Sequence, residues 1–161
     1  MSKPDEHTNP RAGAVSGDAA EARRRQTAEY FDAVAEERLA RLEDSNRYPD
    51  HVASDRQRKA FFDHCMSVIP RPRRVLDVGT GQGTWAVRLA RHADEVVAVD
   101  VGPENLELAR RYADRKGLGN VRFLQADAEN TGMLDASFDI VAHVSVMMYL
   151  PDPEAGLMEV F

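Results

Sequence analysis

A run of apolar residues that leads into three closely spaced glycines constrains the fold of this chain more than any other feature. The segment RVLDVGTGQGTWAVRLA spans residues 74–90 and carries Gly79, Gly81 and Gly83. Apolar residues before the glycines predict a buried strand, and the pattern after them is typical of a helix. Glycine permits a positive φ and a close approach of a ligand to the backbone. Free N–H groups at a helix start point into the same space, so the segment predicts a nucleotide site.

The spacing of the glycines separates two kinds of nucleotide cofactor. A dinucleotide-binding turn reads G-x-G-x-x-G, but the position of the third glycine is taken by Thr84. The sequence instead reads acidic-x-G-x-G-x-G, and the acid is Asp77. A carboxylate beside the turn repels a pyrophosphate and favours a ligand that carries an ammonium or sulfonium group. The pattern therefore favours S-adenosylmethionine (SAM) over NAD.

Apolar segments and helical patterns alternate along the rest of the chain. We predict strands at 74–78, 95–100, 121–125 and 138–144, helices at 83–92 and 103–115, and one more helix that begins at Asp152 and Pro153. Strands joined through helices form right-handed crossovers in a parallel sheet. The expected fold class is α/β, a Rossmann-like open parallel sheet with flanking helices.

The residues before the sheet divide into two segments. Residues 1–20 hold a single large aliphatic residue, Val15, and are expected to form a disordered tail. Residues 21–70 are expected to be helical. Residues 71–161 then form the sheet domain with the nucleotide site.

Two helices are predicted within the N-terminal helical segment. The first covers about 21–44, where apolar residues recur at helical spacing. The second covers 54–68, with Ser54 as its N-cap. Pro49 is expected to end any helix between them.

Two further carboxylates follow the second and third predicted strands. Asp100 ends the second strand and can accept hydrogen bonds from both hydroxyls of a ribose. NAD sites use the same arrangement, so Asp100 does not distinguish the two cofactors. Asp127 closes the third strand, where its carboxylate can accept a bond from an adenine amino group. The neighbouring Ala128 N–H can bond to a ring nitrogen of the same base.

Four motifs, in order, resemble those of the class I SAM-dependent methyltransferases. VLDVGTGQG is similar to the first motif of the family, VVAVD to its second-strand acidic motif, VRFLQADAEN to its adenine-contacting motif, and DASFDIVAHVSVMMYLPDPE to its fourth-strand region. The resemblance covers about residues 73–161. It implies transfer of a methyl group from SAM to a small-molecule acceptor, under a lid formed by the N-terminal helices.

The resemblance also implies a set of cofactor-binding residues: Asp77, Gly79, Thr80, Gly81, Asp100, Val101, Asp127, Ala128 and His143. By this resemblance, Asp77, Gly79 and Gly81 surround the methionine end of SAM. Asp100 holds the ribose, Val101 packs on the adenine, and Asp127 and Ala128 read the edge of the base. His143 takes the place of a family serine whose backbone lies near the methionine moiety.

The chain departs from the family in two places. Met148 and Tyr149 stand where the family often has two histidines. The catalytic residue therefore stays unknown, with His51, His143 and Tyr149 as candidates for a base. The family sheet also continues beyond its fourth strand, so we expect its C-terminal strands to be missing here and the strand at 138–144 to lie at an edge. The chain is then expected to be a fragment of a longer protein.

Composition limits the partners and the compartment. A net charge of -6 and a pI of about 5.4 argue against nucleic acid as a partner. Cys65 is the single cysteine, so an intrachain disulfide is excluded and a reducing compartment is favoured. No apolar run is long enough to cross a bilayer, and the N-terminus lacks the apolar core of a signal peptide. We therefore expect a cytoplasmic protein without a membrane partner or a metal site.

Two other functions stay open at this point. A non-catalytic SAM-binding or partner module is favoured if the chain is complete, and an NAD-dependent oxidoreductase also uses an acid such as Asp100. Neither the methyl acceptor, its reacting atom nor the oligomeric state follows from the sequence.

Overall fold

The structure is a computed structural model that describes residues 17–43 and 49–160. Of the expected disordered tail, residues 1–16 lie outside the described residues. Residues 17–20 are already helical, which the prediction of a tail had wrong. Alanines at positions 19 and 20 have a high helix propensity and follow Asp18, an acid that favours the first turn of a helix.

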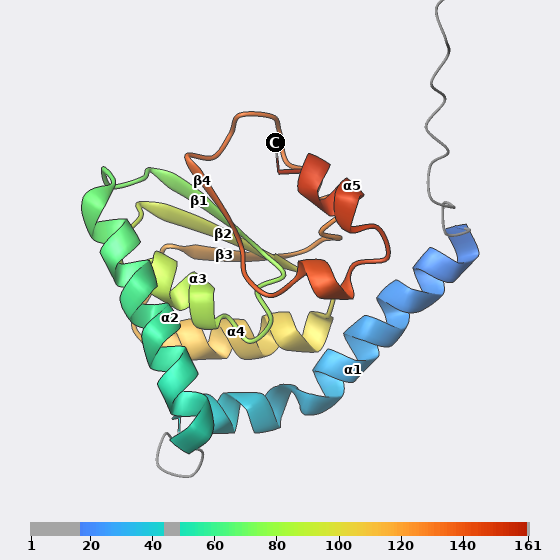
Figure 1. Cartoon of the computed structure of the whole chain (residues 1–161), viewed down its shortest axis with the longest axis horizontal. Helices are drawn as coiled ribbons and strands as arrows, with labels where there is room; N and C mark the ends of the chain where they lie inside the picture. The colour runs from blue at the N-terminus through green and yellow to red at the C-terminus, as the bar shows by residue number, and fades with distance from the viewer. Residues whose placement is uncertain (1–16, 44–48, 161) are drawn as a thin grey trace, which may run out of the picture.

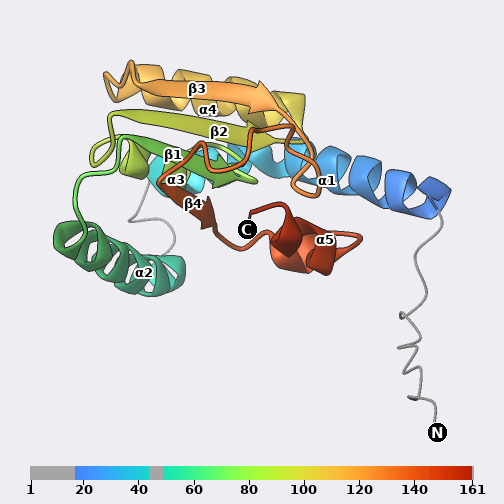
Figure 2. The ribbon, with the colours of Figure 1, turned by 90° about the horizontal axis from the view of Figure 1, so that it is seen from above.

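Four parallel strands form a single sheet: β1 (Arg74–Val78), β2 (Glu95–Asp100), β3 (Val121–Gln125) and β4 (Ile140–His143). Their order is β3-β2-β1-β4, which Figure 2 shows from above. The predicted α/β class and open parallel sheet are confirmed. In the described sheet β4 pairs only with β1 and occupies the edge that the sequence predicts.

Strand β4 is shorter than the predicted 138–144, and its register explains the difference. Ile140 lies beside Val75 and His143 beside Val78, which is the last residue of β1. Beyond Val78 the glycine turn begins, so Val144 has no strand beside it to pair with.

The helices are α1 (Gly17–Glu43), α2 (Pro49–Val68), α3 (Thr84–Leu89), α4 (Pro103–Arg115) and α5 (Pro153–Met158), with a 3-10 turn, η1 (Met147–Tyr149), before α5. Helices α3 and α4 cover one face of the sheet, while α5 lies toward the other (Figure 1). No sequence pattern indicated η1. No helix among the described residues is long and apolar enough to span a membrane.

Two predicted helix boundaries were wrong. Helix α2 begins at Pro49 instead of Ser54, because proline suits the first position of a helix, where no N–H partner is required. Helix α3 ends at Leu89, before the predicted end at residue 92. The His92 N–H bonds to the Leu89 carbonyl, so the chain tightens into a turn there.

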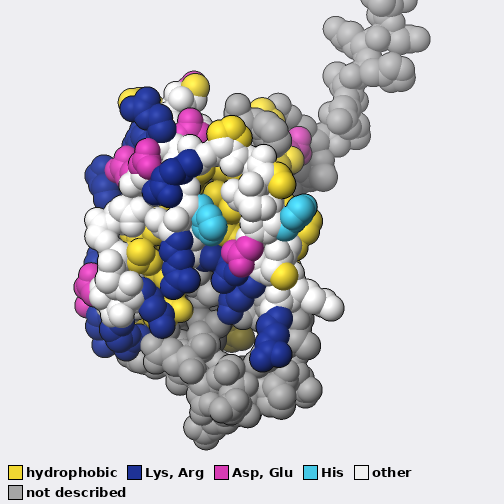
Figure 3. Space-filling view, turned by 90° about the vertical axis from the view of Figure 1, so that its left-hand side faces the viewer, with side chains coloured by type: hydrophobic (Ala, Val, Ile, Leu, Met, Phe, Trp, Pro, Cys, Tyr) yellow, Lys and Arg dark blue, Asp and Glu magenta, His cyan; other side chains and the backbone are white. Residues whose placement is uncertain are grey.

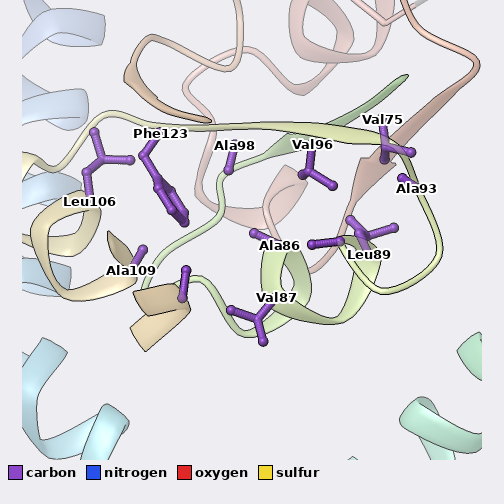
Figure 4. Close-up of a cluster of buried hydrophobic side chains, with 12 residues drawn as sticks. Val75, Ala86, Val87, Leu89, Ala93, Val96, Ala98, Leu106, Ala109 and Phe123 are labelled. Atoms are coloured by element: carbon purple, nitrogen blue, oxygen red, sulfur yellow. The ribbon is translucent and has the colours of Figure 1, made fainter. Parts of the chain in front are cut away.

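Apolar side chains cover both faces of the two central strands. On one face, Val75, Val96 and Ala98 pack against Leu89 and Phe123 (Figure 4). On the other face a second cluster contains Leu76, Val78, Val97 and Val99. Burial on both faces explains why β1 and β2 are almost continuously apolar in the sequence. The core therefore fixes the position of the carboxyl ends of these strands, where the candidate site lies.

The N-terminal ends of the strands lie at the opposite edge of the sheet. Lys and Arg side chains gather on this side of the molecule (Figure 3). Several of them are neutralised by acids nearby: Arg71 Nε lies 2.8 Å from Asp94, and Arg74 Nε lies 2.9 Å from Glu95.

Candidate cofactor site

The turn after β1 adopts the left-handed conformation that its glycines permit. Gly79 has φ of 68° and Gly81 has φ of 54°. A Cβ at position 79 would lie 2.4 Å from a methyl group of Val146, whereas a Cβ at position 81 would meet nothing within 4 Å. Gly79 is therefore required by packing as well as by φ. Gly81 faces open space that a ligand can approach closely.

The buried side chain of Asp77 stabilises this turn. Its side chain is 2% exposed, and its Oδ2 accepts a 2.6 Å hydrogen bond from the Thr80 hydroxyl. Burial raises the pKa of Asp77 to about 7, with a smaller upward contribution from Asp100, while the Thr80 hydroxyl and the Ala86 N–H oppose the rise. The visible partners of Asp77 thus belong to the turn and to α3. Its predicted contact with a cofactor stays a prediction.

Asp100, at the end of β2, lies against the same turn. Its Oδ2 accepts a 2.8 Å bond from the Gly81 N–H, and its Oδ1 accepts a 2.9 Å bond from the Gly102 N–H. Burial raises the pKa of Asp100, and the two backbone N–H groups oppose that rise. A carboxylate has about four acceptor positions, so Asp100 can also accept bonds from a sugar. The structure brings Asp100 and the glycine turn together, as the sequence predicts.

The remaining predicted residues lie around this centre. Thr80 is buried, and its N–H donates to the Val99 carbonyl at 2.9 Å, which fastens the turn to β2. Val101 directly follows Asp100 in the chain and is half-buried. Asp127 accepts a 2.9 Å bond from the Glu129 N–H, and Ala128 packs on the cluster that contains Val78 and Val99.

His143 ends β4, beside the end of β1. Neither ring nitrogen has a hydrogen-bond partner among the described residues, although both atoms are buried. Burial lowers the pKa of the imidazole below its ordinary value, so the ring is neutral at neutral pH. Of the other candidate bases, Tyr149 lies in η1, and the side chain of His51 lies outside the described part of the chain.

Helix α1 passes the carboxyl ends of the strands (Figure 1) and contacts three parts of the site. Arg24 forms ion pairs with Asp127, at 2.5 Å, and with Glu129. Asp32 accepts a 3.1 Å hydrogen bond from the Asn105 N–H in the first turn of α4. Gly102, the N-cap residue of α4, has no side chain that could cap this helix itself. Sequence reasoning missed both Arg24 and Asp32, because neither their spacing nor their composition indicates a partner.

Phe31 provides the third contact of α1. Its ring lies edge to face with Tyr149 in η1, with centroids 4.8 Å apart. The segment after β4 is thereby held against α1, and the candidate site lies between α1 and the sheet.

Comparison with known proteins gives a consistent result. The family model described as "Methyltransferase domain" matches residues 75–161. The uncharacterized methyltransferase YcgJ of Bacillus subtilis is 37% identical over 87 residues, which are 54% of this chain and 34% of that protein. Its crystal structure aligns with a TM-score of 0.60 at 31% identity, over 65% of this chain and 44% of that one.

Two further relatives extend the comparison. A demethylmenaquinone methyltransferase of Thermus thermophilus is 36% identical over 118 residues, or 72% of this chain and 52% of that protein. A structure of DhpI in complex with SAH aligns with a TM-score of 0.55 at 26% identity, over 78% of this chain and 53% of that one. The chain thus spans between a third and about half of the length of these curated relatives.

Proposed function

Since this chain belongs to the class I SAM-dependent methyltransferases, we propose that it binds SAM at the carboxyl edge of the sheet and transfers the methyl group to a small-molecule acceptor. The observation that carries the proposal is the 2.8 Å hydrogen bond between the Gly81 N–H and Asp100. It joins Gly81, where a Cβ would meet nothing within 4 Å, to a carboxylate that accepts three hydrogen bonds and keeps one of its roughly four acceptor positions.

The charge of the site fits a cationic cofactor. Asp77 is buried and Asp100 half-buried, the pKa values of both are raised, and a nearby positive charge favours their ionised form. A pyrophosphate would instead add negative charge beside them. In this proposal, Asp100 binds the ribose, Asp127 and Ala128 bind the adenine, and the turn with Thr80 holds the methionine end. Val101 packs on the base and the backbone of His143 lies near the methionine.

Bound SAM supplies a methyl carbon on a positively charged sulfur; as an acceptor lone pair forms the new bond, the C–S bond breaks and its electrons remain on sulfur. The protein contributes mainly alignment, which can supply about 7–11 kcal/mol of the barrier. In this proposal α1 and α2 form a lid, and α1 excludes water from the carboxyl edge. An acceptor that carries a proton transfers it to water or to a neutral base such as His143.

Related proteins support a small acceptor. Relatives include methyltransferases named for demethylmenaquinone and for ubiquinone biosynthesis. A solved neighbour is a complex with SAH, which supports SAM as the cofactor.

Titration calorimetry with SAM, S-adenosylhomocysteine (SAH) and NAD tests the cofactor, and Gly81→Ala with Gly117→Ala forms a matched pair. Both glycines have a positive φ, 54° and 69°, and a Cβ at either position meets open space. The strain added by alanine is therefore similar, but only position 81 faces the proposed site. We expect Gly81→Ala to weaken SAH binding at least tenfold and Gly117→Ala to leave it unchanged.

Tighter binding of NAD than of SAM, or equal effects of the two alanine variants on SAH affinity, would refute the proposed site. A screen of small acceptors with SAM labelled in the methyl group then tests turnover. Binding of SAM with no methyl transfer to any acceptor class would support a non-catalytic binding module instead.

A further inference from the structure

An open cleft of about 270 Å³ lies between α1 and η1. One wall consists of Arg23, Gln26, Thr27 and Tyr30, and the other includes Met148 and Tyr149. The four residues of α1 recur at i, i+3, i+4 and i+7, so a single face of the helix lines the cleft. The nucleotide site described above uses none of these six residues.

Aromatic side chains dominate the apolar part of the cleft. Tyr30 is 61% exposed, Met148 is 68% exposed and Tyr149 is 39% exposed. The ring of Phe31 lies edge to face with both tyrosines, with centroids 5.2 Å and 4.8 Å apart. Large exposed side chains grouped around a hollow gain most from covering by another flat, apolar group. The polarizable side chain of Met148 can adapt to such a group.

Arg23 gives the cleft a positive charge. It is exposed, and no described carboxylate forms an ion pair with it. Arg24, the next residue, is already paired with Asp127 and Glu129. A guanidinium presents a planar fork of donors that matches a carboxylate. The charge of Arg23 in this cleft therefore favours a ligand with an anionic group.

The cleft also adjoins the glycine turn. Val146 directly precedes η1, and a Cβ at position 79 would lie 2.4 Å from a methyl group of Val146. The segment that forms one wall of the cleft is thus the segment that packs on the turn after β1. Residues 146–149 therefore connect the cleft to the turn to which the methionine end of SAM is assigned.

We infer that this cleft is the acceptor site and that the acceptor is a planar aromatic compound that carries a carboxylate. Arg23 binds the carboxylate, and Tyr30 and Tyr149 contact the ring. The inference rests on the proposed function, because it places the acceptor of that same reaction.

The test uses two flat probes that differ in charge, 2-naphthoate and 2-naphthamide. Each is titrated into the full chain saturated with SAH, and binding is followed by NMR shifts of the backbone amides of Gln26, Thr27 and Tyr149. The same titrations are made with Arg23→Gln and with Arg25→Gln. Arg25 is a matched control, since it is exposed on the same helix, two positions away and on another face.

We expect the unsubstituted chain and Arg25→Gln to bind 2-naphthoate about five- to tenfold more tightly than 2-naphthamide, the scale of an exposed charge-assisted contact. Arg23→Gln is expected to bind the two probes equally. Decahydro-2-naphthoate keeps the charge but not the flat ring, and is expected to bind more weakly than 2-naphthoate.

Equal affinity of the unsubstituted chain for 2-naphthoate and 2-naphthamide would overturn the inference, as would an equal loss in Arg23→Gln and Arg25→Gln. SAH affinity is measured on the same samples. Loss of the probe preference with SAH still bound refutes the acceptor site alone. Failure to bind SAH refutes the proposed function, and the probe comparison in the free chain then still decides whether the cleft prefers an aromatic carboxylate.

Discussion

Carboxylates stand at both ends of the parallel strands, and their surroundings shift their pKa values in opposite directions. At the N-terminal edge, Asp139 accepts 2.8 Å bonds from the N–H groups of Arg73 and Arg74, and these bonds lower its pKa. At the carboxyl edge, burial raises the pKa values of Asp77 and Asp100. An ionised aspartate thus stabilises the N-terminal edge. At the carboxyl edge, ionising an aspartate costs free energy.

The difference indicates which edge carries the function. At the N-terminal edge Asp94 and Asp139 are exposed, and Asp94 is paired with Arg71. The carboxyl edge combines the buried Asp77 and the half-buried Asp100 with three left-handed glycines, Gly79, Gly81 and Gly83. Perturbed pKa values concentrate where a site must be preorganised for a ligand. The N-terminal edge therefore serves stability, while the carboxyl edge keeps an arrangement that a cationic ligand can relieve.

The largest effect is expected from alanine at Gly79. A positive φ of 68° and a Cβ 2.4 Å from Val146 add backbone strain and overpacking, together about 2–4 kcal/mol of unfolding free energy. Gly119→Ala at the N-terminal edge is the control, because its φ is not positive and a Cβ there meets nothing within 4 Å. Urea denaturation measures both variants. Equal losses of stability would mean that neither the φ of Gly79 nor its packing on Val146 requires a glycine there.

The second effect concerns cofactor affinity. Asp100→Asn keeps the shape of the side chain but removes the charge that the ribose hydroxyls are proposed to bond. We expect SAH affinity to fall by about 1–3 kcal/mol, or roughly 5- to 150-fold. Asp139→Asn makes the same chemical change at the other edge and should leave SAH affinity unchanged. Calorimetry that shows equal affinity for both variants would contradict the ribose assignment.

A third effect is a dependence of stability on pH. The pKa of Asp77 rises from 3.8 to about 7 on folding, so between these values the folded chain binds more protons than the unfolded chain. This contribution to stability is complete below the unfolded pKa and is lost as the pH rises through the folded pKa. Between about pH 5 and about pH 7, the free energy of unfolding of the unsubstituted chain should fall by about 1–2 kcal/mol because of Asp77, and Asp77→Asn should lack this fall.

Unfolding curves of the free chain and of Asp77→Asn across that range check the prediction. Parallel pH profiles would mean that Asp77 is ionised in the folded chain at all these pH values. The contrast with Asp139 would then lie in exposure alone.

The sequence predicted the parts of the fold that local patterns encode. The bounds of β1, β2 and β3 are confirmed because each is an apolar run between clear breakers, and α4 because Pro103 begins it. Asp100 and the glycine turn could be placed together from the sequence, since the carboxyl ends of parallel strands share an edge. The assignment of cofactor atoms to these residues stays a prediction.

Contacts between distant segments could not be derived in the same way. Arg24 bonds to Glu129 across 105 positions, and Asp32 reaches the first turn of α4 from another helix. No periodicity marks such a pair. The sequence also did not show that packing requires a glycine at position 79 whereas position 81 faces open space, because this difference depends on where Val146 packs.

The smallest effect is expected at the N-terminal edge itself. Asp139→Asn keeps an acceptor for the N–H groups of Arg73 and Arg74 but removes the charge that strengthens both bonds. Because the folded pKa of Asp139 is lowered, its contribution is present above the unfolded value and is lost as the pH falls through the folded one. At neutral pH, the variant should therefore have a slightly lower melting temperature than the unsubstituted chain. In strong acid, the two melting temperatures should be the same. Thermal melts at both pH values measure this, and a difference that grew in acid would show that Asp139 does not act through its charge, leaving the two edges less distinct than their pKa values indicate.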